Sequence, residues 1–324
     1  MTSDIDGYRN TVAGIKLDIV RGGPDRQPST ARRVQSDFGV AVSAVEPGCK
    51  TISHTHLEHD RMSVSYVLNA APGTRWCGEL DMAAGMTVIH QPDAEHTAVN
   101  LPGTRFAFAI IDVDAVVERS EVLEVPLRSW RPGDVDVGAP GPAAGAAPIF
   151  AHLISAPIES IPARLLDDLL TVVALSLSNP ETDQRLRTTA AVDSRKVVGD
   201  CIDFAETIGR EPSIAEMCLA SHVSGRRLRQ AFHDLFQVSP KRFFRHWILG
   251  QAHDRLLEAE PYDTSVTNVA VDLGLTHLGR FSTQYRELHG ECPSQTLHRS
   301  PEHGGLPAGR SRPEFGLNSC RTPS

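Results

Sequence analysis

The feature that most constrains this chain is a helix–turn–helix pattern that occurs twice in its last third. The first copy spans residues 214–236, with a turn at 221–223. The second spans residues 266–288, with a turn at 274–276. Two short helices joined at a tight turn, and repeated, are typical of proteins that read DNA rather than of enzymes.

The second helix of the first copy has two distinct faces. Leu228, Phe232 and Leu235 follow a spacing of four and then three residues, which predicts one buried stripe. The opposite face carries arginine, glutamine and histidine, whose side chains bond to base edges and phosphates. A solvated helix face is the alternative, but the second copy favours DNA reading. The candidate contacts here are Arg226, Arg227, Arg229, Gln230 and His233.

The second copy repeats this division into faces. Gly274 stands where the turn needs a positive φ or close packing. Phe281 and Tyr285, four residues apart, predict the buried stripe of its second helix. The candidate DNA contacts of this copy are His277, Gly279, Arg280, Thr283 and Gln284.

One long helix is expected between the two copies. Ser239 is suited to cap it and Pro240 to occupy its first position. From there to about residue 259 the helix has roughly 20 residues, which at ~1.5 Å each gives a length of ~30 Å. This is close to the ~34 Å turn of B-DNA, so the helix could hold two recognition helices in successive major grooves.

The second copy also carries a longer motif. A small apolar pair, a glycine-led turn and two aromatic residues are followed by a Gly-x-x-Pro-Ser segment. These are Val269-Ala270, Gly274-Leu275, Phe281, Tyr285, Gly290 and Pro293-Ser294. The last 100 or so residues thereby resemble the DNA-binding domain of the AraC/XylS transcription regulators. Leu275 replaces the family's usual phenylalanine, a swap that a core tolerates.

This resemblance has implications for function. It implies an effector-controlled transcription factor, usually an activator, that binds double-stranded DNA through the outward faces of its two recognition helices. It also makes RNA polymerase an expected partner and a homodimer the expected assembly.

The net charge of −8 is unevenly distributed. Residues 1–194 hold 16 basic and 25 acidic residues, whereas residues 195–300 hold 13 of each. Between 224 and 245 a single acid, Asp234, stands among six basic residues. The local potential, rather than the whole-chain charge, meets the phosphates of DNA.

The N-terminal half alternates apolar and small or polar residues with a period of two between about 36 and 125. Stretches near 38–44, 62–68 and 106–111 are punctuated by glycine and proline, which favours an antiparallel β barrel or sandwich. In AraC-like proteins a cupin-like barrel that binds the effector stands here, and the stretch from Trp76 to Leu80 loosely resembles such sensor domains. The expected fold class is therefore α+β, a cupin-like β domain followed by an all-α domain.

A group of histidines in this half could carry chemistry. His54 and His56 with Asp60, and His96 further on, resemble the two metal-binding motifs of cupins, although Asp60 and Ala94 replace the usual Glu and Gly. Three interpretations stay open: a Zn, Fe or Mn site, the polar lining of an effector pocket, or an ordinary surface or core. We expect a metal-free pocket without cofactor or catalytic residues. Its expected lining is His54, His56, Tyr66, Trp76 and His96.

The expected segments follow from these patterns. They are an N-terminal arm (1–35), the cupin-like domain (36–130), a Gly/Ala/Pro linker (131–148), a helical dimerisation segment (149–192), the DNA-binding domain (193–300) and a disordered tail (301–324). Within 157–178 an apolar stripe either packs on the barrel of the same chain or forms a dimer seam. The stripe consists of Ile158, Ile161, Leu165, Leu169 and Val172.

Composition limits the remaining classes. The sequence contains no run of ~18 apolar residues, so no membrane span is predicted. The first residues lack the pattern of a signal peptide. Six scattered cysteines are expected as thiols in a cytoplasmic protein. The expected function is a small-molecule-responsive transcription regulator, not an enzyme. The alternatives are a metal-dependent cupin enzyme fused to a DNA-binding module, and a ligand-independent dimeric regulator.

Overall fold

Two antiparallel sheets and ten helices are seen in the computed structural model, over the residues that it describes. The described residues are 2–3, 15–25, 29–35, 40–78, 80–127, 133, 135–138, 145–155, 163–178, 189–259 and 264–299.

The larger sheet has seven strands in the order β1-β3-β4-β11-β6-β9-β12. They are β1 (Thr2–Ser3), β3 (Thr30–Gln35), β4 (Val40–Glu46), β11 (Arg105–Asp112), β6 (Arg61–Asn69), β9 (Thr87–His90) and β12 (Val135–Gly138). The smaller sheet has the order β2-β5-β10-β7-β8. Its strands are β2 (Ile15–Arg21), β5 (Thr51–Leu57), β10 (Glu95–Asn100), β7 (Arg75–Trp76) and β8 (Leu80–Asp81).

The two sheets face each other and form what we call the β sandwich, residues 15–138. Because side chains alternate along a strand, each strand contributes every second residue to the interior. Val45 of β4, Val67 of β6 and Trp76 of β7 belong to one buried cluster inside the sandwich. The alternation expected from the sequence is thus confirmed as two antiparallel layers around an apolar interior.

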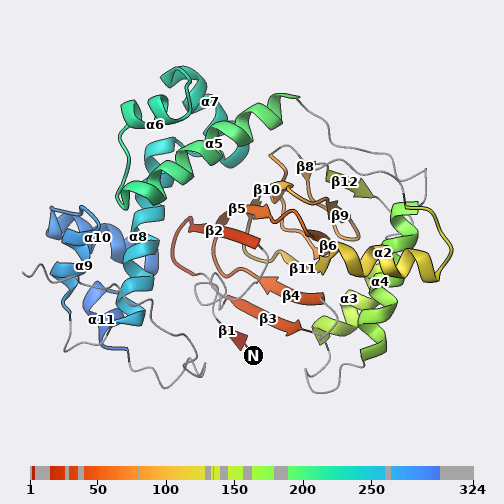
Figure 1. Ribbon diagram of the computed structural model, residues 1–324. Helices are drawn as coiled ribbons and strands as arrows, with labels where there is room; N and C mark the ends of the chain where they lie inside the picture. The colour runs from red at the N-terminus through yellow and green to blue at the C-terminus, as the bar shows by residue number, and fades with distance from the viewer. Residues whose placement is uncertain are drawn as a thin grey trace, which may run out of the picture.

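Three helices cover the outer face of the larger sheet (Figure 1). These are α2 (Val113–Val122), α3 (Ala146–Ser155) and α4 (Ala163–Ser178). Phe150 of α3 and Leu169 of α4 are fully buried in the same cluster as Met62 and Val64 of β6. Of the two interpretations left open for the 157–178 stripe, the structure favours packing on the same chain. Ile158 and Ile161 lie outside the described residues.

The C-terminal helices form a second layer beside the smaller sheet (Figure 1). They are α5 (Thr189–Ile208), α6 (Ile214–Ala220), α7 (Gly225–Phe236), α8 (Pro240–Glu258), α9 (Val266–Asp272), α10 (Leu278–His289) and α11 (Pro293–Leu297). Their core is rich in aromatic rings; Phe232 of α7 lies 5.4 Å from Phe243 and 5.7 Å from Phe244 of α8, between ring centroids. The two expected helix pairs and the long helix between them are therefore present.

The β sandwich and the C-terminal helices share one apolar core. Val20 of β2, Ile52 of β5 and Val99 of β10 belong to the same buried cluster as the helices α5 to α11. At the other end of this contact, His246 Nδ1 lies 2.8 Å from the carbonyl oxygen of Arg21. The sandwich therefore packs directly against the helices.

Two expected segments, the N-terminal arm and the linker, differ from the structure. Strands β2 and β3 lie within the expected N-terminal arm, and both are paired in the sheets. Strand β12 lies within the expected linker and pairs with β9 from Val135 to Gly138. Strand β12 has only four residues, too few to show a clear period of two. Strand β2 does alternate apolar and charged residues from Ile15 to Ile19, and this signal was overlooked. The expected tail, 301–324, lies outside the described residues.

Within the described part of the chain, each helix is too short or too polar to cross a lipid bilayer.

Candidate DNA-reading surface and sandwich cavity

Helix α7 presents the expected polar face to solvent. Ser224 caps it, since its side chain accepts a hydrogen bond from the backbone N–H of Arg227. Leu228, Ala231, Phe232 and Leu235 hold the other face in the core. Four candidate contacts, Arg226, Arg229, Gln230 and His233, are exposed, and Arg227 is half-buried. Gln230 Nε2 donates to Asp234 Oδ1 at 2.5 Å on the same helix.

Helix α10 presents a second such face. The buried rings of Phe281 and Tyr285 fix its orientation. The candidates His277, Gly279, Arg280 and Thr283 are exposed. Gln284 departs from the expected face: it is half-buried and borders a hollow together with Arg242 and His246 of α8.

The turn between α9 and α10 has the expected conformation. Gly274 has a φ of +71°, a value that L residues rarely adopt. A β carbon at this position would lie 3.4 Å from Cβ of Arg210. The glycine is therefore required by the backbone and by a close neighbour.

A hollow separates the two helix pairs. Arg210, Lys241, Arg245 and Arg280 line it, together with the acid Glu211. Arg245 Nη2 pairs with Glu211 Oε2 at 2.6 Å. Burial raises the pKa of Glu211, whereas Arg245 lowers it. The lining of this hollow carries more positive than negative side chains.

The C-terminal core also contains a polar network. His253 Nδ1 of α8 lies 2.6 Å from the hydroxyl of Tyr285, which lies 2.8 Å from Oγ1 of Thr296 in α11. The ring of His289 stacks on His253 with centroids 4.2 Å apart. Burial, and then the neighbouring His253, lower the pKa of His289 to about 2. The network joins α8, α10 and α11.

The β sandwich encloses a cavity of about 80 Å³, measured as the space open to the centre of a water molecule. Its walls are mostly apolar and come from both sheets. The polar lining includes Ser53 and Thr55 of β5, Ser63 and Ser65 of β6, Asn100 of β10, and the histidines His90 and His96. Trp76 Nε1 donates to Asn100 Oδ1 at 2.9 Å. Trp76 and His96 thus lie where they were expected.

The other three expected pocket residues lie outside this cavity. Ser53 and Thr55 face the cavity, so His54 and His56, which alternate with them, lie on the outer face of β5. There His54 faces α5: a β carbon on Gly199 would lie 3.9 Å from its Nε2. Tyr66 lies on the outer face of β6, where its ring stacks with Phe150 at 6.1 Å. The cupin-like grouping of His54, His56 and His96 around one point is therefore wrong for this chain.

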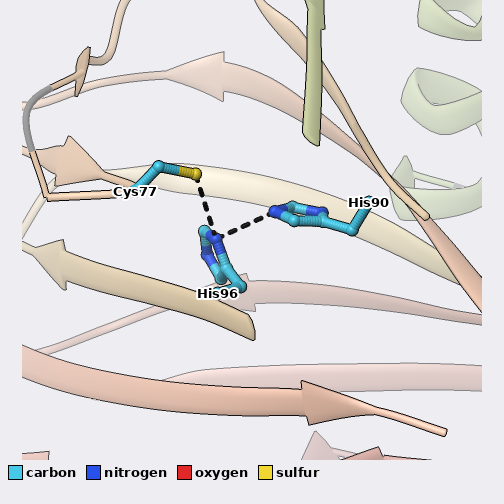
Figure 2. A group of neighbouring side chains, drawn as sticks. All are labelled: Cys77, His90 and His96. Carbon is cyan, nitrogen blue, oxygen red and sulfur yellow. Dashed lines mark hydrogen bonds between the residues drawn. The ribbon is translucent and has the colours of Figure 1, made fainter. Parts of the chain in front are cut away.

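A different trio of side chains converges at the cavity wall. Cys77 Sγ lies 3.6 Å, and His90 Nε2 lies 2.9 Å, from Nδ1 of His96 (Figure 2). Cys77 follows β7, His90 ends β9, and His96 is the second residue of β10. Figure 2 shows the three side chains pointing toward one another, Cys77 from the turn after β7 and the two histidines from β9 and β10.

Burial determines the protonation of this trio. It lowers the pKa of His90 to about 3, with Arg195 of α5 as the second cause. It lowers the pKa of His96 well below its usual range, helped by His90 and Arg195. Burial also raises the pKa of the Cys77 thiol to about 11. Both rings and the thiol are therefore neutral near pH 7.

Sequence reasoning missed Cys77 and His90. One available signal was the six-residue separation of His90 and His96 around the short Pro92–Asp93 turn, which keeps two imidazoles close where the chain crosses from the larger sheet to the smaller one. Cys77 had no comparable signal, because its contact with His96 arises from the pairing of β7 with β10.

Comparison with known proteins identifies the class of the C-terminal region. Residues 217–299 match the family model described as a helix-turn-helix domain. The matching family model is of the AraC type, and the curated proteins that this chain resembles are AraC/XylS-type regulators. The match includes α7 and α10, which carry the candidate DNA contacts, together with α8 and α9 between them.

Curated relatives match a part of this chain. The "Probable thc operon regulatory protein" of Rhodococcus erythropolis is 29% identical over 106 residues, which is 32% of each chain. The "XylDLEGF operon transcriptional activator 1" of Pseudomonas putida is 34% identical over 94 residues, 29% of this chain and 28% of the relative. The chain thus spans about a third of the length of these relatives.

Solved structures show further likenesses. A probable AraC family transcriptional regulator from Rhodopseudomonas palustris is 30% identical, with a TM-score of 0.29 over 32% of this chain and 95% of the other. Unsaturated fatty acid-bound ToxT from Vibrio cholerae is 9% identical, with a TM-score of 0.35 over 89% of this chain and 96% of the other.

Proposed function

We propose that this protein is a sequence-specific DNA-binding transcription regulator controlled by a small molecule. The observation that carries the proposal is the pair of exposed polar faces on α7 and α10, within a domain of the AraC type. Arginine, glutamine and histidine are the side chains that discriminate bases in the major groove. Both faces remain exposed while the β sandwich packs against the helices, so DNA can reach them in this conformation.

The spacing of the two faces supports simultaneous reading. Helix α8 has 19 residues, which at ~1.5 Å each gives about 28 Å. This is near the ~34 Å that separates successive major-groove segments on one side of B-DNA. Helices α7 and α10 then contact two successive major-groove segments of a single DNA site.

The region between the helices suits the phosphate backbone. Arg210, Lys241, Arg245 and Arg280 line the hollow that separates the two helix pairs. The N-cap of α10, His277, makes no side-chain capping hydrogen bond among the described residues. Backbone N–H groups at such a helix start bind phosphate oxygens readily.

The sandwich cavity is the proposed effector site, in a domain that we interpret as cupin-like. Its lining is largely apolar with a few convergent polar groups, which is typical of small-molecule sites. The neutral rings of His90 and His96 can donate or accept hydrogen bonds there. The expected effector is therefore small and mostly apolar, with one or two polar groups.

The mode of regulation follows from the relatives. The Pseudomonas putida relative is named an operon transcriptional activator, so we propose activation with RNA polymerase as partner. A cytoplasmic homodimer is the proposed form, because two domains on one operator raise affinity through effective concentration.

DNA selected from a random pool tests the proposal. Arg226→Ala and Arg229→Ala should each weaken binding to the selected site by about 1–3 kcal/mol and binding to a scrambled site much less. Arg255→Ala is the matched control, because Arg255 is exposed on α8, outside both reading faces. Equal losses on both DNAs would assign the arginines to phosphates, and failure to enrich any sequence would contradict the proposal.

The effector site needs a separate experiment. Candidate small molecules are screened for a change in affinity for the selected DNA, and the hit is repeated with Ser65→Leu. Ser65 is 6% exposed and lines the cavity, so the larger side chain should abolish the response. An undiminished response would place the effector elsewhere.

A further inference from the structure

The trio of Cys77, His90 and His96 exceeds what an apolar effector pocket requires. Cys77 and His90 are 4% and 2% exposed. Burying polar side chains in an apolar wall costs free energy that hydrogen bonds or a bound ligand must offset. The three atoms Sγ, Nε2 and Nδ1 all lie within 4.8 Å of one another.

We propose that Cys77, His90 and His96 bind one thiophilic transition-metal ion, with Zn²⁺ as the best fit. In a tetrahedral zinc site the bond lengths of 2.0–2.3 Å place neighbouring donor atoms roughly 3.3–3.7 Å apart. The 3.6 Å distance from Cys77 Sγ to His96 Nδ1 falls within this range, and the 2.9 Å distance from His90 Nε2 is shorter than it. Small side-chain rotations are enough to bring all three atoms around one centre.

The donor set selects the class of metal. One thiolate and two imidazoles suit Zn²⁺ or Cu⁺, whereas Mg²⁺ and Ca²⁺ prefer oxygen ligands. Only three protein ligands are present in the trio, and His90 and His96 both line the cavity. A fourth position therefore faces the cavity, where a water molecule or a polar group of a small molecule can bind.

The charge around the trio bears on the choice of the fourth ligand. On metal binding the Cys77 thiol loses its proton, and the thiolate cancels one positive charge of the ion. Arg195 is 7% exposed and close enough to lower the pKa of both histidines. Its guanidinium disfavours extra positive charge, and so favours an anionic fourth ligand such as hydroxide or a carboxylate.

The backbone fixes the three ligands before any metal arrives. Cys77 has a φ of +53°, and its N–H donates to the carbonyl oxygen of Thr97 at 2.7 Å. The tight turn after His90 is closed by a 3.1 Å hydrogen bond from Ala94 N–H to the Gln91 oxygen. A non-glycine residue held at positive φ is uncommon and is found often at functional sites.

Cobalt is the probe, because Co²⁺ bound by a thiolate absorbs strongly in the near ultraviolet and in the visible when tetrahedral. Full-length protein treated with a chelator and a reductant is titrated with Co²⁺, and Zn²⁺ is then added. We expect one cobalt ion per chain, with a thiolate absorption band that Zn²⁺ removes. Titration with Cu⁺ under anaerobic conditions, in competition with Zn²⁺, decides which ion binds more tightly.

Matched variants assign the ligands. Cys77→Ser should abolish the thiolate band, and His90→Gln and His96→Gln should each lower cobalt affinity at least tenfold. Cys49→Ser and His56→Gln are the controls, because Cys49 is buried outside the trio and His56 lies on the outer face of β5. Circular dichroism of each metal-free variant establishes that it is folded.

The outcomes are decisive. Absence of cobalt binding by the folded wild-type protein would overturn the proposal and leave a hydrogen-bonded trio of structural role. A thiolate band that survives in Cys77→Ser would move the site to another cysteine and overturn it equally. The titration contains no DNA or effector, so its result does not depend on the proposed function.

Discussion

The two halves of this protein direct their polar side chains in opposite directions. The C-terminal helices bury aromatic rings and expose Arg226, Arg229 and Arg280. The β sandwich encloses histidine, serine and asparagine in its interior. Side chains on a helix surface are open to solvent and can bind a partner directly. The sandwich interior admits only molecules that fit between the two sheets. The function of the C-terminal half is therefore easier to predict from the sequence, because its functional side chains face outward.

The largest expected effect tests how far the sandwich depends on its helical cover. Leu169→Asp should cost more than about 4 kcal/mol, because it removes a fully buried leucine and buries a carboxylate. The free energy of unfolding from denaturant titration measures it. Leu175→Asp, at an exposed position of the same helix, should change stability little. If Leu169→Asp instead yields a stable monomer from a dimer, α4 is a dimer seam and our account of its packing is wrong.

A smaller loss is expected at the turn of the second helix pair. Gly274→Val should destabilise the protein by about 2–3 kcal/mol, because a β-branched residue is strained at a φ of +71°. Gly279→Ala is the control, since a β carbon there meets no atom within 4 Å among the described residues. Thermal melts of both variants give the comparison. Equal melting temperatures would contradict the assigned turn.

The C-terminal core should also lose stability in acid. The pKa of His289 is about 2 when folded and near 6.5 when exposed. Below pH 6.5 the unfolded chain therefore takes up a proton that the folded chain does not. The free energy of unfolding thus decreases as the pH decreases. His289→Phe keeps the stacking with His253 but cannot be protonated. We expect the variant to recover roughly 1–2 kcal/mol of the stability that the wild type loses between pH 6.5 and 5. Parallel pH profiles for the two proteins would refute this origin.

The smallest expected effect concerns the start of the long helix. Ser239→Ala should cost about 1 kcal/mol, because its side chain accepts a hydrogen bond from the N–H of Arg242. Denaturant midpoints of Ser239→Ala and of a Ser239→Asp variant, which can still cap, measure the loss. A loss shared by both variants would show that the cap contributes nothing.

Much of the C-terminal domain could be predicted because its signals are local. Ser224, Ser239 and Gly274 each mark a helix start or a turn through their own backbone chemistry, and all three lie where they were expected. Gln284 was misplaced because its environment depends on α8, which packs against α10 from a distant part of the chain.

The sandwich interior could be predicted only in part, because a strand reverses its faces at every residue. The pair His54 and His56 looked like a ligand pair, yet Ser53 and Thr55 take the inner positions. The sheet class follows from alternation alone. Which parity faces inward depends on the pairing of β5 with β2 and β10, and such long-range pairing leaves no local mark in the sequence.

Strand β10 separates the cavity from the core of the C-terminal helices and contributes side chains to both. Ala98 and Asn100 face the cavity, and Val99 between them packs in the core of the C-terminal helices. A ligand that shifts this strand therefore acts on both compartments at once, and thermodynamic linkage makes the influence mutual. If an effector raises the affinity for operator DNA by a given factor, operator DNA must raise the affinity for the effector by the same factor. Calorimetry of one ligand in the presence of the other would measure the coupling free energy between the two sites.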